Sequence, residues 1–300
     1  MGRQLIAVLA FVVLATAGWA QDKLRVVAVN YPLQYFAERL LGDEAADVIV
    51  PVPEGVDPSF WRPSISDISA IQAADLILLN GAGFATWTDK VSLPRSKLVT
   101  TSRGLEDRFI TTQSITHSHG DGGTHSHEGV GSYLWLDVSM AAEQASAVAN
   151  AIVARGLADA AQVDARLSEL VAELDALDQA AHDSLVGAAD AVFVATHPRY
   201  QYLARAYGLT IKSLEWDAGA MPSKDDLADL ETLTRQFGAT ILIWEAEPPQ
   251  AARTAVAELG LTDVVFPTLA IEPSEMDMLE ALETAFGALS DAVAQTKTMQ

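Results

Sequence analysis

Residues 191–207 read AVFVATHPRYQYLARAY, and this strand–turn–helix stretch decides the fold class. The first six residues form a short apolar run with little polar alternation, which is typical of a strand buried on both faces. His197 and Pro198 end the run, and the proline favours a helix over about Arg199–Tyr207. A buried strand followed by a helix is the repeating unit of a parallel sheet covered by helices.

The same unit recurs in two blocks of the chain. In the first block the predicted strands and helices are Lys23–Val29, Pro32–Leu41, Asp47–Val52, Ser66–Ala74, Asp75–Asn80 and Lys97–Thr101. In the second block, besides the stretch quoted above, they are Thr210–Trp216, Lys224–Phe237, Thr240–Glu245, Gln250–Leu259, Asp263–Leu269 and Met276–Val293. We therefore predict an α/β fold with two parallel-sheet, (βα)4-like lobes.

A long helix, predicted over Asp159–Val186, joins the two blocks. Its apolar residues are spaced by four and three, which gives one narrow stripe along the helix: Val163, Leu167, Leu170, Leu174 and Leu177. A coiled-coil dimer would show the same pattern, but the stripe covers only about two heptads, so we favour an intramolecular spine. The predicted domains are an N-terminal lobe (21–138), the helices (139–186) and a C-terminal lobe (187–300), with a ligand cleft between the lobes.

Charge and the N-terminus restrict the class of protein. The 300 residues carry 19 Lys and Arg against 40 Asp and Glu, a net charge of −21, and no Cys. This charge argues against a nucleic-acid partner, and the lack of Cys excludes thiolate metal sites. Arg3, the apolar run Leu5–Ala17 and the small residues Gly18 and Ala20 predict a cleaved signal peptide over residues 1–20. We accordingly expect a periplasmic monomer without a lipid anchor.

Histidine is concentrated in one internal segment, residues 116–128. Four of the six histidines lie there, as two His-x-His pairs around a glycine-rich turn: His117, His119, His125 and His127. Neutral imidazole binds zinc, copper and nickel, so we expect this segment to bind such a metal weakly and to exchange it rapidly. The alternative is a solvated polar linker.

A second candidate site lies at the predicted cleft. His197 follows one buried strand and Glu245 ends another, so both are expected at the same edge of the sheet, with Glu247 two residues further on. A carboxylate at this place could ligate a cation or orient the imidazole. The alternatives are a helix-capping or core histidine and a solvated loop acid.

With these residues in view, the chain resembles the zinc/manganese class (cluster A-I) of ABC-transporter solute-binding proteins. Gly55–Ser64 is similar to the family segment Gly-x-Asp-Pro-His-x-Tyr-x-Pro, and Tyr133–Asp137 to His-x-Trp-Leu-Asp, which follows a His-rich loop in zinc members. His197–Leu209 resembles His-x-x-Phe-x-Tyr followed by Tyr-Gly-Leu. The resemblance covers nearly the whole chain after residue 20. It implies the two-lobed fold, a metal cation as cargo and the membrane permease of an ABC importer as partner.

The resemblance fails at the family's metal ligands, usually three histidines or two histidines and a glutamate, often with an acid from the last lobe. By position only His197 remains, because the other places hold Ser59, Tyr133 and, for the acid, Pro267. One imidazole with neutral hydroxyls is a poor tetrahedral zinc site.

Three functions follow from these residues. The first is a zinc-binding component that uses the loop histidines and a rearranged cleft of His197 and Glu245, with Ser59, Tyr133 and Glu247 as candidate cleft-lining residues. The second is a cleft that binds an organic ligand or a metal chelate, or an accessory metallochaperone. An enzyme is disfavoured, because the sequence has neither a His-Glu-x-x-His nor a Gly-x-Ser-x-Gly motif.

Overall fold

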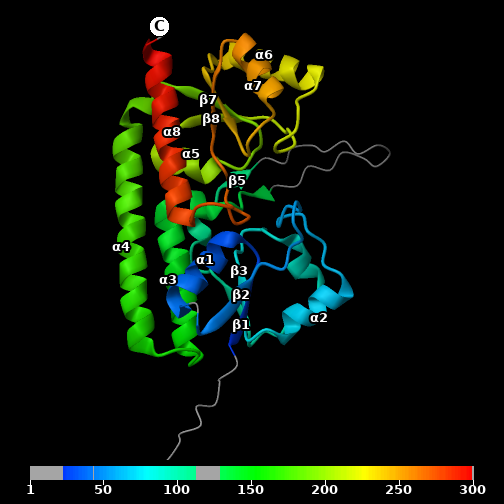
Figure 1. Cartoon of the computed structure of the whole chain (residues 1–300), viewed down its shortest axis with the longest axis vertical. Helices are drawn as coiled ribbons and strands as arrows, with labels where there is room; N and C mark the ends of the chain where they lie inside the picture. The colour runs from blue at the N-terminus through cyan, green and yellow to red at the C-terminus, as the bar shows by residue number, and fades with distance from the viewer. Residues whose placement is uncertain (1–22, 43, 113–128, 299–300) are drawn as a thin grey trace, which may run out of the picture.

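The computed structural model describes residues 23–42, 44–112 and 129–298. The predicted signal peptide and the loop histidines His117, His119, His125 and His127 lie outside these ranges. Within them, two four-stranded parallel sheets form two lobes that follow one another along the long axis of the molecule (Figure 1). None of the helices in the described ranges is long and apolar enough to cross a bilayer.

The N-terminal lobe is built on a sheet of order β2-β1-β3-β4. Its strands are β1 (Leu24–Ala28), β2 (Ala46–Ile49), β3 (Leu76–Leu79) and β4 (Leu98–Thr100). The helices α1 (Tyr31–Leu41) and α2 (Ile65–Ala73) alternate with them. The short 3-10 helix η1 (Thr86–Lys90) lies between β3 and β4, and η2 (Glu106–Arg108) and η3 (Leu134–Leu136) come after β4. Helix α1 begins where the side chain of Asn30 accepts a hydrogen bond from the Leu33 amide at 3.3 Å, as an N-cap does.

The C-terminal lobe repeats this plan with the sheet order β10-β9-β7-β8. Its elements are β7 (Val192–Ala195), α5 (Gln201–Tyr207), β8 (Thr210–Ser213), α6 (Lys224–Phe237), β9 (Ile241–Trp244), α7 (Gln250–Glu258) and β10 (Thr262–Val265). The two central strands, β7 and β9, are continuous apolar runs, and Phe193, Ile241 and Ile243 are fully buried. The predicted two-lobe α/β fold is confirmed.

The predicted strand Asp263–Leu269 is wrong at its end. Strand β10 stops at Val265, and Pro267, which has no amide hydrogen to donate to a ladder, follows two residues later. Leu269 then has a positive φ of 55°, in the left-handed region that strands do not use. The chain leaves the sheet here and becomes part of the cavity wall described below.

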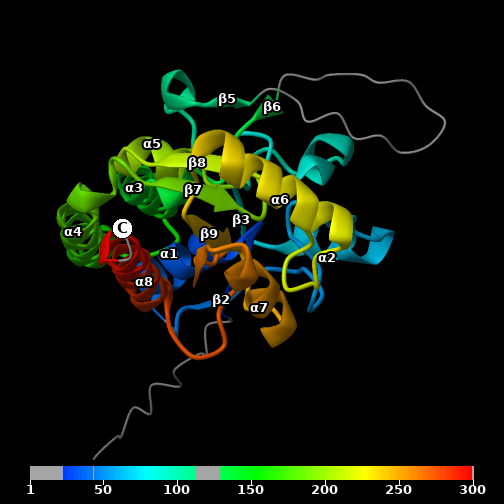
Figure 2. The ribbon, with the colours of Figure 1, turned by 90° about the horizontal axis from the view of Figure 1, so that it is seen from above.

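Three long helices lie on one side of the molecule (Figures 1 and 2). Helix α4 (Ala160–Leu185) runs along both lobes, α3 (Val138–Ala154) lies beside the N-terminal lobe and α8 (Met278–Thr298) beside the C-terminal lobe, and the one-turn η4 (Val186–Ala188) follows α4. Val163, Leu170 and Leu174 of the predicted stripe are fully buried, because α4 packs on α3, α8 and α1 within the same chain. The intramolecular spine is thereby confirmed and the coiled-coil alternative is not needed.

The segment 113–128 begins and ends at a small antiparallel ladder. Strand β5 (Thr111–Thr112) pairs with β6 (Gly129–Val130). The hydroxyl of Tyr202 on α5 accepts a hydrogen bond from the Ile110 amide at 3.2 Å. The base of the His-rich segment is therefore attached to the C-terminal lobe as well as to the N-terminal one.

We predict that Leu174→Ala lowers the free energy of unfolding by about 2–5 kcal/mol, because it removes a buried side chain and leaves a cavity between α4 and its neighbours. Urea denaturation followed by circular dichroism measures this loss. Glu169→Ala, an exposed position of the same helix, is the control and should change the free energy by less than about 0.5 kcal/mol. Equal effects of the two substitutions would contradict a buried spine.

Candidate functional site

The carboxyl ends of β7 and β9 bring His197 and Glu245 together. The two strands are parallel neighbours, with Ala195 opposite Ile243, and each side chain follows its strand by one or two residues. The imidazole Nδ1 lies 3.5 Å from Glu245 Oε2. Both atoms are buried and neither has a hydrogen-bond partner among the described residues. A bound group that donates hydrogen bonds would satisfy both acceptors.

A third side chain at this edge was missed by the sequence analysis. Arg199 is 8% exposed, and its guanidinium pairs with the carboxylates of Glu245, through Nη1, and Asp57, through Nη2 at 2.5 Å. Its Cζ lies 5.1 Å from the centre of the Tyr133 ring, in cation–π contact. Glu245 belongs to the C-terminal lobe and Asp57 to the N-terminal lobe, so the guanidinium joins the two lobes.

The residues at the family's first two ligand positions support this arrangement. Ser59 donates from its amide at 2.8 Å and from its hydroxyl at 2.6 Å to Asp57 Oδ1, which leaves Oδ2 for Arg199. Tyr133 packs against Phe84 and Trp135, with ring centres 5.7 and 5.0 Å away. Burial raises the pKa of the Tyr133 hydroxyl well above its usual range, so the hydroxyl stays protonated.

Electrostatics distinguishes the two carboxylates. Burial acts to raise the pKa of Asp57, but Arg199 and the hydrogen bonds from Ser59 outweigh it and hold the pKa below its usual value. For Glu245 burial prevails over Arg199 and over the Thr268 hydroxyl, which donates at 3.1 Å, so its pKa is raised. Burial, with Arg199 close by, lowers the pKa of His197 to about 4. The imidazole is therefore neutral at neutral pH.

Two cavities meet at these side chains. The larger, of about 550 Å³, is lined by Asp57, His197, Arg199 and Glu245 and also by Leu269 and Pro267, the latter at the family's acid position. The second, of about 400 Å³, is lined by Ser59, Tyr133, His197 and Arg199, and also by Thr112 and Gly129 at the ends of β5 and β6. The base of the His-rich segment thus opens onto the cleft.

Glu247 lies elsewhere, contrary to the expectation that it lines the cleft. Its side chain is 74% exposed and accepts two hydrogen bonds from Arg253 Nη2, at 2.9 and 3.0 Å. Burial falls along the chain after Glu245, since Ala246 is half-buried and Glu247 is exposed. In the described ranges no group of three or more His, Asp or Glu side chains is placed to hold a metal ion.

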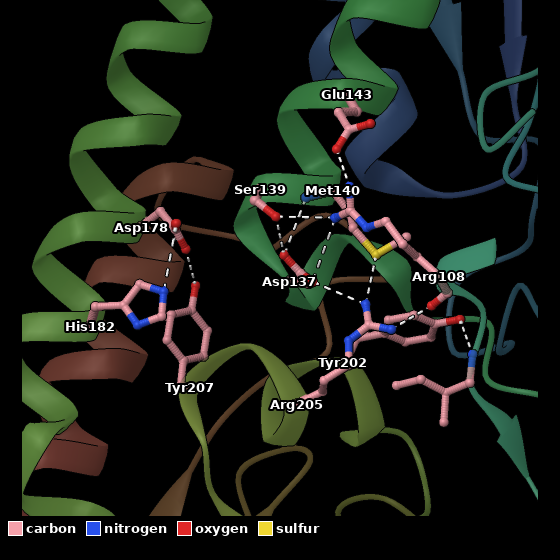
Figure 3. Close-up of polar contacts among 11 residues, drawn as sticks. Arg108, Asp137, Ser139, Met140, Glu143, Asp178, His182, Tyr202, Arg205 and Tyr207 are labelled. Atoms are coloured by element: carbon pink, nitrogen blue, oxygen red, sulfur yellow. Dashed lines mark hydrogen bonds and ion pairs between the residues drawn. The ribbon is translucent and has the colours of Figure 1, made fainter. Parts of the chain in front are cut away.

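A second set of contacts joins the lobes outside the cavities. Figure 3 shows Arg205 of α5 reaching Asp137 at 3.2 Å and the main-chain carbonyl of Arg108. In the same view Tyr207 donates to Asp178 of α4 at 2.8 Å. Asp137 also caps α3 by accepting from the Met140 amide at 3.3 Å, so its position is fixed by the helix it begins.

Known proteins resemble the chain over most of its length. It matches the family described as "ZnuA: Zinc-uptake complex component A periplasmic" over residues 26–292. The "High-affinity zinc uptake system protein ZnuA" of Bacillus subtilis (strain 168) is 26% identical over 256 residues, 83% of this chain and 79% of that protein. The "Zinc-binding lipoprotein AdcA" of Streptococcus pneumoniae serotype 4 is 29% identical over 83% of this chain, which spans about half of AdcA.

Among solved structures, the metal-dependent lipoprotein YcdH of Bacillus subtilis superposes with a TM-score of 0.73 at 24% identity, over 90% of this chain and 98% of that one. This likeness shows the fold. The match over residues 26–292 shows the family: the chain belongs to the ZnuA family, whose members are solute-binding proteins and not enzymes.

We predict that the stability of the metal-free protein falls between about pH 6.5 and pH 4, in part because of His197. In this range the unfolded chain binds a proton at the imidazole and the folded chain does not, so protonation favours unfolding. The variant His197→Gln has no imidazole to protonate at this position, so it lacks this contribution to the free energy of unfolding. Urea denaturation from pH 7 to pH 4 should show the wild type losing up to about 3 kcal/mol more than the variant. Parallel pH curves would contradict a neutral, buried His197.

Proposed function

We propose that this protein is the zinc-binding, extracytoplasmic solute-binding component of an ABC importer. The family match over residues 26–292 carries the proposal, because that family is described as a component of zinc uptake. The two curated relatives named above are likewise called zinc-uptake and zinc-binding proteins. Zinc is then the cargo, the membrane permease of the importer is the partner, and the protein acts in the periplasm as a monomer.

The loop histidines are the proposed capture site. His117, His119, His125 and His127 offer four imidazoles, and the glycines between the two pairs allow both pairs to turn toward one ion. Thr112 and Gly129, which flank residues 113–128, line the same cavity as His197. A cation released by the loop would therefore reach the mouth of the cleft beside His197.

Release to the permease is proposed to need only small shifts of the lobes. Helix α4 packs on elements of both lobes, and Arg199 and Arg205 each pair across them. A wide hinge opening would break these contacts together. Docking to the permease would instead need to change only contacts next to the His-rich segment, such as the hydrogen bond from the Ile110 amide to the Tyr202 hydroxyl.

A second candidate function is the capture of a small organic ligand or a metal chelate. One observation favours it: the cavity of about 550 Å³ combines apolar walls, including Phe60, Leu269 and Ile271, with the unpartnered acceptors of His197 and Glu245. Such a ligand needs an apolar body and an N–H or O–H donor. Mass spectrometry of small molecules released from the purified protein decides between this function and zinc capture.

We predict that replacing the four loop histidines by asparagine together weakens zinc binding at least tenfold, because it removes the imidazoles and keeps the length and polarity of the segment. Isothermal titration of the untagged protein with zinc measures the change. His182→Asn, on the exposed side of α4, is the control and should leave the affinity unchanged. If the untagged wild type binds no zinc, the proposed function is wrong.

A further inference from the structure

The family's ligand positions surround a side chain that is already positively charged. Ser59 holds Asp57, whose second oxygen binds the Arg199 guanidinium at 2.5 Å, and the Tyr133 ring lies beneath that guanidinium. His197 precedes Arg199 by two residues and lines both cavities with it. The same larger cavity includes Pro267, the position of the missing acid. The guanidinium thus stands at the centre of the set of positions that the family uses for its cation.

We propose that Arg199 is a built-in cation that takes the place of cargo in the inter-lobe cleft, so that the cleft binds zinc only when Arg199 is removed. This inference rests on the proposed function for the identity of the cargo. It assigns all zinc capture to residues outside the cleft, and it makes Arg199 the residue that determines which ligands the cleft admits.

Three properties of the guanidinium support this role. Arginine stays charged at every pH at which the protein is folded, so the internal cation cannot leave by losing a proton. Its planar fork contacts a carboxylate of each lobe, Glu245 and Asp57, which are the anionic groups that a metal would use. Its burial at 8% exposure leaves little water to screen a second positive charge brought next to it.

The remaining donors fit this reading as well. An imidazole and a phenol bring no negative charge near neutral pH, so neither His197 nor Tyr133 would draw a divalent ion past the arginine. Without the guanidinium, His197 and the carboxylates of Asp57 and Glu245 would form a set of one imidazole and two acids around the vacated space. That donor set suits zinc and manganese.

The experiment measures zinc binding in the full chain with the four loop histidines replaced by asparagine, which isolates the cleft. We expect no saturable zinc binding while Arg199 is present. Adding Arg199→Ala should create one saturable zinc site per chain, and zinc should then raise the melting temperature. Adding His197→Asn to this variant should abolish the new site.

Matched variants separate charge from a general loosening of the lobes. Arg205→Ala also removes an arginine that joins the lobes, but Arg205 lies outside both cavities, so it should create no zinc site. Arg199→Lys keeps the positive charge and should also create none. Arg199→Gln, which retains a donor for Asp57, is the second neutral variant if the alanine variant does not fold, and it should gain the site.

Three results would overturn the inference. One is a zinc site in the loop-substituted chain that requires His197 while Arg199 is intact. Another is the absence of any new site in a folded Arg199→Ala or Arg199→Gln variant. The third is an equal gain in Arg205→Ala. A wild type that binds no zinc would instead refute the proposed function, and the comparison of the Arg199 variants would still decide the inference.

Discussion

The pairing of one buried guanidinium with carboxylates from both lobes sets the properties of the cleft. A buried ion pair is stable only when its partners are well placed, and removing one partner leaves an uncompensated charge that costs about 3–5 kcal/mol. Arg199 meets this condition through Asp57 and Glu245, and Ser59 and Thr268 supply further hydrogen bonds to the two acids. The guanidinium of Arg199 thus holds the two lobes together without a bound metal ion.

The same charge determines what can enter. At an effective dielectric constant of about 20, a divalent cation about 4 Å from a guanidinium is repelled by about 8 kcal/mol. Two nearby carboxylates would attract the ion, but each is already engaged by Arg199. A neutral ligand with hydrogen-bond donors meets no such penalty, since the free acceptors of His197 and Glu245 lie side by side in the wall. The cleft and the histidine-rich segment therefore differ in the class of ligand they favour.

Sequence patterns predicted the features of this structure that depend on residues close together along the chain. Apolar runs predicted the parallel strands, the spacing of leucines predicted the face that α4 buries, and the strand ends predicted that His197 and Glu245 share an edge. Arg199 was missed because its partners are 142 and 46 residues away, so no local spacing reveals them. The available signal was weak: an arginine four residues past the end of a buried strand, at the sheet edge where Glu245 also follows its strand. Glu247 was misplaced because it lies in the loop after β9, where strand periodicity no longer tells which residues face the cleft.

The unusual residues of the cleft are consistent with one another once Arg199 is considered. Without a metal, the half-buried Asp57 and the buried Glu245 would have no counter-charge, and the guanidinium supplies it. With the guanidinium in place, additional histidines would find no ion to bind and would have to be buried without partners. Serine at position 59 and tyrosine at position 133 avoid that cost, because one orients Asp57 and the other packs its ring under the cation. The loss of the usual metal ligands and the presence of Arg199 therefore belong together: the guanidinium, and not a bound metal ion, neutralises the acids of the cleft.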